Sequence, residues 1–440
     1  MVPMYCLNIA VSLPLLFWPI WFARTELRLR GINPFTIVLL IALPVELMRY
    51  YIGPFFLIEG RLLDEGYQYA LFMANILALT NALGTLFFFR FARSIGAHRY
   101  LPFQRVVIGR NDLHRGARVF LLIFCLALFA LANAEFGIWN WLQDPRMGYQ
   151  LYRTGQGHWY ALATSALSVS FVLAFFANPT AGHLLFKMVM YLGMGYFLGS
   201  KGVLLAIFAS GLVFLWFLRW RHLKKLIFLG LPPVFALMIV SSFQVFEGGF
   251  GLANIIGYFD YFMNAANYYR GYLNNEISLF NGEVIISSLW SYVPRAIWPD
   301  KPFVYGMIHV NEIFYPGLAE QTYTPAFGGA VEQFADFGPL GVVILGFFSS
   351  KAILTGFFSY FIFRRPGINL NHITLTTVLL FLVQFTPSFG SFFPGGLYLL
   401  LLFSVLILVR MLRRARRKHG GKLIRIESQL GSPEQVFDPK

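Results

Sequence analysis

The sequence predicts an all-α membrane protein with about eleven transmembrane helices. Of its 440 residues, 57% are hydrophobic and only 12% are charged, and the mean hydropathy is +0.62. A soluble domain carries about 25% charged residues, so this chain has too few charges to cover a surface in contact with water. Its apolar runs do not alternate as barrel strands do, so they must satisfy their backbone hydrogen bonds as helices in lipid.

The predicted spans follow one another along the chain, and most are close to the length that crosses a bilayer. They cover residues 4–22, 34–50, 68–90, 119–138, 160–177, 184–200, 202–218, 226–243, 338–362, 373–389 and 392–411. The interval 244–337 is predicted to be one large folded loop, because long structureless loops are uncommon in compact proteins. We therefore expect a single integral-membrane domain over residues 1–425, followed by a polar tail at 426–440.

The net charge of +15 is better explained by orientation than by a nucleic-acid partner. Lys and Arg collect in cytoplasmic segments, and 25 of the 35 fall there if the N-terminus lies outside and the C-terminus inside. The cluster RMLRRARRKHGGK directly follows the last span, where it would contact anionic lipid. This orientation places the large loop outside. Lys187 and Lys351 lie within spans and are expected to extend toward the cytoplasmic face.

Several kinds of site are absent from the sequence. Cys6 and Cys125 are isolated, and the eight His are scattered, so neither a disulfide framework nor a metal site is predicted. The sequence has no Walker loop, no Asp-x-Asp pair and no serine nucleophile elbow. A nucleotide-sugar substrate is therefore disfavoured.

The most specific cluster of candidate residues lies in the large loop. The segment SYVPRAIWPDKP places Arg295 and Lys301 between prolines, close to Trp290 and Trp298. Cations outside run against the topological trend, and Arg grips phosphate oxygens in bidentate fashion. The segment thus favours a phosphorylated, lipid-borne ligand. The alternative is that Arg295 only pairs with a nearby carboxylate, that of Asp300 or Glu283.

Other cations on the predicted outer side could reach the same ligand. They are Arg146, Arg153, Lys201 and Arg270. A solvated loop position is the alternative for Arg146 and Arg153. For Lys201, which lies in the tight turn between two spans, the alternative is an interfacial lysine that extends to water.

The carboxylates Glu332 and Asp336 precede the ninth span. If this stretch is helical, their spacing places both on one helix face. Either could act as the general base for a sugar hydroxyl, or both could serve only to cap or to balance the helix dipole. His309 is a further candidate in the same loop.

The aromatic segment 251–275 is predicted to form a helix with rings around much of its circumference. Its rings are Tyr258, Phe259, Tyr261, Phe262, Tyr268, Tyr269 and Tyr272. They would form either an aromatic belt at the membrane interface or a platform on which sugar rings stack.

With its dozen or so spans, one late outer loop, VPRAIWPDKP and EQFADFGPLG, the chain resembles the Wzy-type O-antigen and exopolysaccharide repeat-unit polymerases. The spacing of an Arg, ten residues and a Gly, at Arg146 with Gly157 and at Arg295 with Gly306, is also similar to motifs in some members. The resemblance implies a fold of the GT-C type in the bacterial inner membrane. It also implies that oligosaccharides on undecaprenyl diphosphate are joined without metal or nucleotide. A flippase and a chain-length regulator of the same pathway are the implied partners.

On this reading we assign catalytic roles to Arg295 and Lys201, which would stabilise the leaving diphosphate, and to Glu332 as the base. The residues expected to bind diphosphate or glycan are Arg146, Arg153, Arg270, Lys301, Trp298, Asp336 and His309.

Three alternative functions stay open from the sequence. O-antigen ligases carry a Ser-Arg-Gly turn that here reads Ser200-Lys201-Gly202, and the His-Asn that they place before the final Gly-x-x-Gly is replaced at Phe327. A flippase or carrier would favour internal repeats and ionisable groups at the midplane, and no repeat is visible. A non-catalytic partner in glycan assembly would tolerate loss of Arg295 and Glu332.

Overall fold

The computed structural model describes residues 2–47, 64–99, 107–135, 137–146, 157–243, 262–293, 295, 297–320, 325–363, 370 and 373–385. Within these residues every regular element is a helix, and one isolated bridge joins Val107 to Thr374. The prediction of an all-α protein is confirmed.

The helices are described in three groups, which lie before, within and after residues 244–337. We call this segment the long connection. Before it lie α1 (Val2–Thr25), α2 (Pro34–Leu47), α4 (Glu65–Ser94), η3 (Ala97–Arg99), α5 (Arg110–Glu135), α6 (Ile138–Gln143), α8 (Gly157–Ala177), α9 (Ala181–Tyr196), α10 (Lys201–Phe217) and α11 (Leu223–Phe243). Within it lie α13 (Phe262–Leu273), α14 (Glu283–Ser288), η5 (Leu289–Tyr292), α15 (Ile308–Phe314) and α16 (Val331–Phe334), and after it α17 (Gly338–Phe347), α18 (Ser350–Phe363) and α19 (Leu375–Phe385).

The chain is a multi-pass membrane protein by the length and composition of its helices. In the part of the chain that the structure describes, five helical segments are long and apolar enough to cross a membrane: Met4–Thr25, Glu65–Ser94, Arg110–Ala134, Gly157–Ala177 and Gly338–Phe363, the last of which combines α17 and α18. Every predicted span up to residue 389 overlaps a helix. The span 392–411 and the tail 426–440 lie outside the described residues, so the number eleven stays a prediction.

The predicted ninth span is divided into two helices, which is a departure from the expectation of one. α17 ends at Phe347 and α18 begins at Ser350. Ser349 Oγ accepts the Ala352 amide at 3.1 Å and donates to Asn81 Oδ1 of α4. A helix that begins inside a bundle needs acceptors for its first amides, and the Ser349 side chain supplies one of them.

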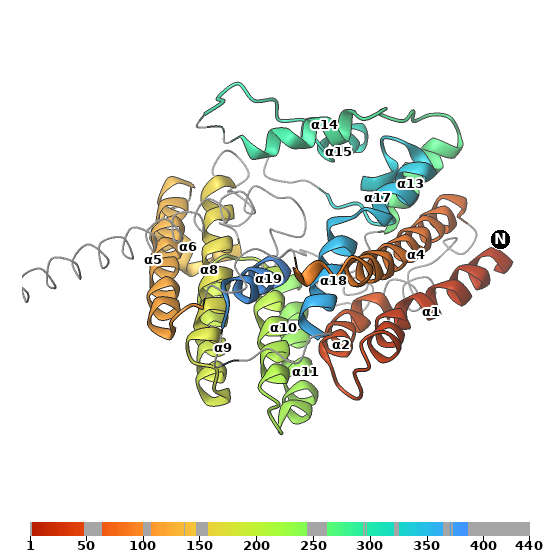
Figure 1. Ribbon diagram of the computed structural model, residues 1–440. Helices are drawn as coiled ribbons and strands as arrows, with labels where there is room; N and C mark the ends of the chain where they lie inside the picture. The colour runs from red at the N-terminus through yellow and green to blue at the C-terminus, as the bar shows by residue number, and fades with distance from the viewer. Residues whose placement is uncertain are drawn as a thin grey trace, which may run out of the picture.

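The main hydrophobic core surrounds α8. Every residue from Ala163 to Ala177 is buried. α5 and α8 stand side by side in Figure 1, and α9 packs against α8. Ser170 Oγ donates to the Ala117 carbonyl of α5 at 2.6 Å and lies 2.5 Å from the Tyr191 hydroxyl of α9. This contact satisfies polar groups at the centre of an otherwise apolar core, as burial requires.

A second group of helices, α1, α4, α17 and α18, packs beside the first (Figure 1). Backbone approach here is close: a Cβ on Gly84 of α4 would lie 2.2 Å from the Phe347 carbonyl oxygen. A Cβ on Gly356 of α18 would lie 2.8 Å from the Thr85 carbonyl oxygen. Small residues permit this spacing, as is usual between membrane helices. The long connection lies across one end of this group, with α13 against α4.

Candidate functional site

Helix α13 anchors the long connection to α4 and packs against α16 of the same connection. Tyr268 and Tyr269 are fully buried, and the Tyr269 ring meets Phe334 at 4.9 Å between centroids. The Tyr269 hydroxyl donates to the Gly329 carbonyl at 2.5 Å. These two rings therefore form the core of the connection, and the expectation of an interfacial belt or sugar platform is wrong for them. Tyr258, Phe259 and Tyr261 lie outside the described residues.

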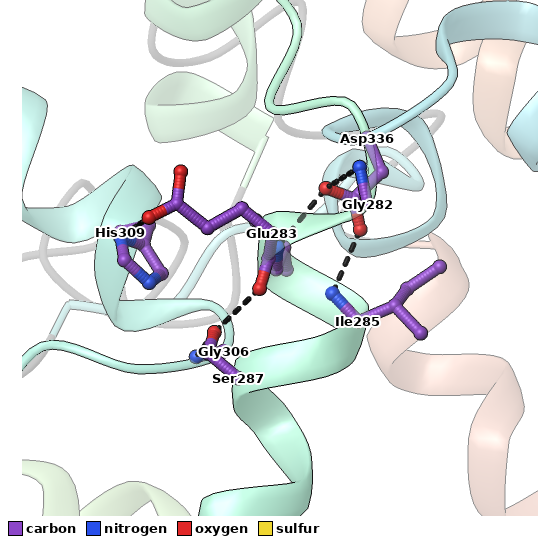
Figure 2. A network of polar contacts seen from close by, with 8 residues as sticks. Gly282, Glu283, Ile285, Ser287, Gly306, His309 and Asp336 are labelled. Carbon is purple, nitrogen blue, oxygen red and sulfur yellow. Dashed lines mark hydrogen bonds and ion pairs between the residues drawn. The ribbon is translucent and has the colours of Figure 1, made fainter.

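Asp336 holds the first turn of α14 (Figure 2). It is 1% exposed, and its Oδ1 accepts the amides of Gly282 at 2.9 Å and Val284 at 3.0 Å, while Oδ2 accepts that of Ile285 at 2.8 Å. A carboxylate at a helix N-terminus satisfies free amides and complements the helix dipole. Asp336 is thus a buried cap, which leaves it no access to a glycan.

Glu332 and Asp336 do not share a helix face, contrary to the sequence prediction. α16 is a single turn that ends at Phe334, so Asp336 turns inward while Glu332 remains accessible. The surrounding protein nevertheless removes part of the hydration of Glu332 and raises the pKa of its carboxyl, and a hydrogen bond with Gln333 acts in the opposite direction. Glu332 is accordingly the carboxylate that remains available for proton transfer.

His309 lies beside Glu283 in the same network (Figure 2). The distance from His309 Nδ1 to Glu283 Oε1 is 3.9 Å, longer than a hydrogen bond. Ser287 Oγ connects the two regions, since it accepts the Gly306 amide at 2.9 Å and donates to the Glu283 carbonyl at 2.6 Å. Gly306 has a φ of +56°, a left-handed conformation that glycine adopts without strain.

Two cations of the loop around Arg295, Arg295 itself and Lys301, donate hydrogen bonds to its backbone carbonyls. The Arg295 guanidinium donates to the carbonyls of Lys301 and Pro302 and lies 3.8 Å from the centroid of the Phe303 ring. Lys301 is buried, and its Nζ donates to the Val293 carbonyl at 3.0 Å. Burial first, and the Arg295 charge second, lower the pKa of Lys301. Both side chains thus stabilise the loop. Arg295 forms neither of the two ion pairs considered for it, with Asp300 or with Glu283.

Trp298 completes this loop by packing against Trp290, with the ring centroids 5.7 Å apart in an edge-to-face arrangement. Edge-to-face pairs are a favourable aromatic geometry. The pair forms an aromatic surface next to the two cations.

Arg270 joins α13 to the start of α4. Its guanidinium pairs with Asp64, whose other oxygen accepts the Gly66 amide at 2.9 Å as the cap of α4. The Arg270 side chain is 48% exposed. It therefore has a structural partner while part of it still faces solvent.

Arg146 and Lys201, from distant parts of the sequence, are brought together at the turn between α9 and α10. Arg146 Nη1 donates to the Gly199 carbonyl at 3.3 Å, and Trp141 Nε1 of α6 donates to the Phe197 carbonyl at 2.7 Å. Lys201 is the first residue of α10. Burial lowers the pKa of Lys201 to about 8, and the neighbouring Arg146 charge adds to this effect.

This turn has the properties of an anion site. Helix α10 begins there, and its Ser200 cap makes no side-chain hydrogen bond to the helix amides. The first amides of a helix and its dipole favour an anion, and two adjacent cations do so as well. Arg153, another cation predicted to reach the same ligand, lies outside the described residues.

Two curated proteins match this chain. The O-antigen polymerases of Salmonella typhimurium (strain LT2) and Salmonella typhi are each 29% identical to it over 227 residues, which is 50% of this chain and 54% of theirs. Over half of its length the chain is therefore similar in sequence to O-antigen polymerases, the proteins that its motifs also resemble. It spans about half the length of the curated relatives that it matches. No family model matches it, and no solved structure does.

The predicted site residues of this chain separate into two groups. Arg146 and Lys201 lie together at the start of α10. The others, Arg270, Arg295, Trp298, Lys301, His309, Glu332 and Asp336, lie in the long connection. Tertiary structure, and not spacing along the chain, decides which of these side chains still face solvent.

Proposed function

We propose that the chain joins oligosaccharide repeat units carried on undecaprenyl diphosphate into O-antigen or exopolysaccharide. The reaction would take place at the periplasmic face of the inner membrane, with the lipid diphosphate as leaving group. Similarity to O-antigen polymerases supports the reaction class. The observation that carries the assignment of a site is the pairing of Arg146 and Lys201 at the start of α10.

A diphosphate fits this pair for electrostatic reasons. Like charges that are held close together repel each other. Burial, and in addition the neighbouring Arg146 charge, lowers the pKa of Lys201. An anion between them would offset the repulsion, and the α10 amides would donate to its oxygens.

The reaction exchanges one C–O bond for another. A hydroxyl of one repeat unit attacks the anomeric carbon of the other chain, a glycosidic bond forms, and the bond from that carbon to the diphosphate breaks. Lys201 and Arg146, together with Arg153, would stabilise the charge that develops on the diphosphate. Glu332 would accept the hydroxyl proton, because its raised pKa brings it closer to neutrality, where a base is most effective. This mechanism requires no metal.

The remaining predicted residues have supporting roles in the proposal. Arg295 and Lys301 hold the loop that presents Trp290 and Trp298 to the glycan. Arg270 and His309 remain candidates for glycan contact because each lies near the surface of the long connection. Asp336 is left out of the substrate-binding set because backbone amides occupy its carboxylate.

The test is a gel ladder of surface glycan from a strain that lacks this protein. The strain is complemented with the wild type, Lys201→Ala, Arg146→Ala or Glu332→Gln, and with Lys224→Ala as the matched control. Lys224 is an exposed cation at the start of α11. We expect the wild type and the control to restore long chains. The three site variants should leave a single repeat unit on the acceptor at normal protein levels, a loss of at least about 100-fold in polymer.

Other outcomes would assign another function. Polymer that forms but is not attached in the deletion strain would indicate a ligase. Repeat units trapped on the inner leaflet would indicate a flippase. Full-length ladders from Lys201→Ala and Arg146→Ala would remove the diphosphate site from the proposal.

A further inference from the structure

A cavity of about 570 Å³ lies inside the helix bundle, apart from the Arg146–Lys201 pair. Its walls come from α1, α2, α4, α18 and α19, from Val213 of α10, and from Phe262, Gly329 and Ala330 of the long connection. This volume is within the range of small-molecule sites, about 300–1,000 Å³. The contribution from the long connection indicates that the cavity lies beneath it.

Polar side chains line the cavity within helices predicted to cross the membrane. On α18, Lys351, Thr355 and Ser359 recur every four residues, so they form one stripe that faces the cavity. On α4, Asn75 and Asn81 line it as well. Polar and ionisable groups inside membrane helices are costly and usually serve function. Lys351, which was expected to extend toward the cytoplasmic face, is exposed and also lines this cavity.

Several of these groups have unused hydrogen-bonding capacity. Ser359 is fully buried, and its Oγ has no hydrogen-bond partner among the described residues. The same holds for the buried Oε1 of Gln384, which lines the cavity from α19. Lys351 forms no ion pair or hydrogen bond with the described part of the chain. A ligand that supplied partners to these atoms would remove the cost of leaving them unpaired.

The chemistry of the walls selects among ligand classes. Although most of the wall is apolar, a hydrocarbon chain would leave its polar atoms unpaired. A simple anion would meet the Glu46 carboxylate as well as the Lys351 ammonium, the two ionisable groups among the lining residues. A neutral ligand with many hydroxyls fits better, since it can donate to Gln384 Oε1 and Glu46 and accept from Lys351 and Ser359. Trp18 and Phe385 supply rings on which a sugar could stack.

We propose that this cavity binds a saccharide unit that enters from the side of the long connection. The inference rests on the proposed function only in naming the repeat-unit oligosaccharide as the ligand, and it gives one of the two reacting glycans a place within the bundle. Because Arg146 and Lys201 do not line the cavity, glycan binding here and diphosphate binding at α10 can be tested separately.

Binding is measured on the full chain in lipid nanodiscs by saturation-transfer difference NMR. The probe is the repeat-unit oligosaccharide released by mild acid from the lipid carrier of the same cells. We expect transfer to the oligosaccharide with wild type and with Lys201→Ala, and at least a fivefold loss with Ser359→Leu and with Gln384→Leu. Ser94→Leu, an exposed position at the end of α4, is the matched control and should bind as wild type does. Equal transfer to all variants would overturn the proposal.

A second measurement guards against variants that fail to fold. Thr355→Cys is placed in a background with Cys6→Ser and Cys125→Ser, which removes the two exposed native thiols. The oligosaccharide should slow N-ethylmaleimide labelling of position 355 at least threefold and leave labelling of a Glu320→Cys control unchanged. Unchanged labelling at 355, or equal slowing by sodium phosphate or by added lipid alone, would overturn the assignment to a saccharide. Loss of polymer in Lys201→Ala with oligosaccharide binding retained would leave both proposals standing.

Discussion

Lys201 shows how the local environment can change the charge of one side chain. Its pKa of about 8 lies well below the ordinary value for lysine, so a change of solution pH near neutrality alters its charge. The cause is burial at the start of α10 and the Arg146 charge beside it. A group with a lowered pKa is cationic below that pKa and neutral above it.

We therefore expect the apparent second-order rate constant of polymerisation, kcat/KM for lipid-linked substrate, to fall as pH rises through about 8. This parameter reports the ionisation of the free enzyme, so binding of the diphosphate does not mask the effect. In Lys201→Arg the cation persists at all accessible pH values, and the alkaline fall should disappear or move upward. An alkaline limb unchanged in Lys201→Arg would show that another group titrates.

Asp336 shows, at the scale of one element, how a distant side chain can determine whether a short helix forms. α14 has only six residues, and its first turn depends on a carboxylate 51 to 54 positions away in sequence. A helix of this length is not stable alone. Its position, and with it that of the following Trp290, depends on the Asp336 contacts.

We expect Asp336→Asn to destabilise the long connection by about 1.5–3 kcal/mol, the usual value of hydrogen bonds to a charged group. The amide keeps one acceptor oxygen but presents N–H groups to the α14 amides. Hydrogen exchange in nanodiscs should show faster exchange at the amides of 282–288. Asp300→Asn, at an exposed position, is the control and should leave exchange there unaltered. Protection that survives in Asp336→Asn would contradict the capping role.

At the scale of the whole molecule, orientation is the property on which the proposed chemistry depends. The charge distribution predicts that the long connection lies outside and that the segment between α10 and α11 lies inside. In Figure 1 the helices of the long connection lie at the top of the bundle, and the turn between α10 and α11 lies at the bottom.

Reporter fusions would test this orientation directly. We expect alkaline phosphatase to be active when fused after Gly317, because the enzyme matures only outside the cytoplasm, and inactive when fused after Arg221. A green fluorescent protein fused at the same two positions should give the opposite pattern. The reverse result at both sites would invert the membrane orientation and move the proposed reaction to the cytoplasmic side.

Some features follow from the sequence because they depend on local composition. The helices α1, α4, α5 and α8 coincide with apolar runs that any bilayer would turn into helices. The division of the ninth span was not predicted, although Ser349 and Ser350 within an apolar run offered a signal. The polar stripe on α18 carried a similar signal in the fourfold spacing of Lys351, Thr355 and Ser359.

The sequence alone thus determined that this chain is a helical membrane protein that resembles O-antigen polymerases, and it supplied the list of charged candidate residues. Only the tertiary structure decided which of them lie close together. In the folded chain Arg146 lies beside Lys201, and Asp336 caps α14. Arg295 hydrogen-bonds within its own loop, and Glu332 stays accessible. The physical reason is that insertion into lipid depends on local hydrophobicity, whereas burial, hydrogen bonding and pKa depend on neighbours that are distant along the chain.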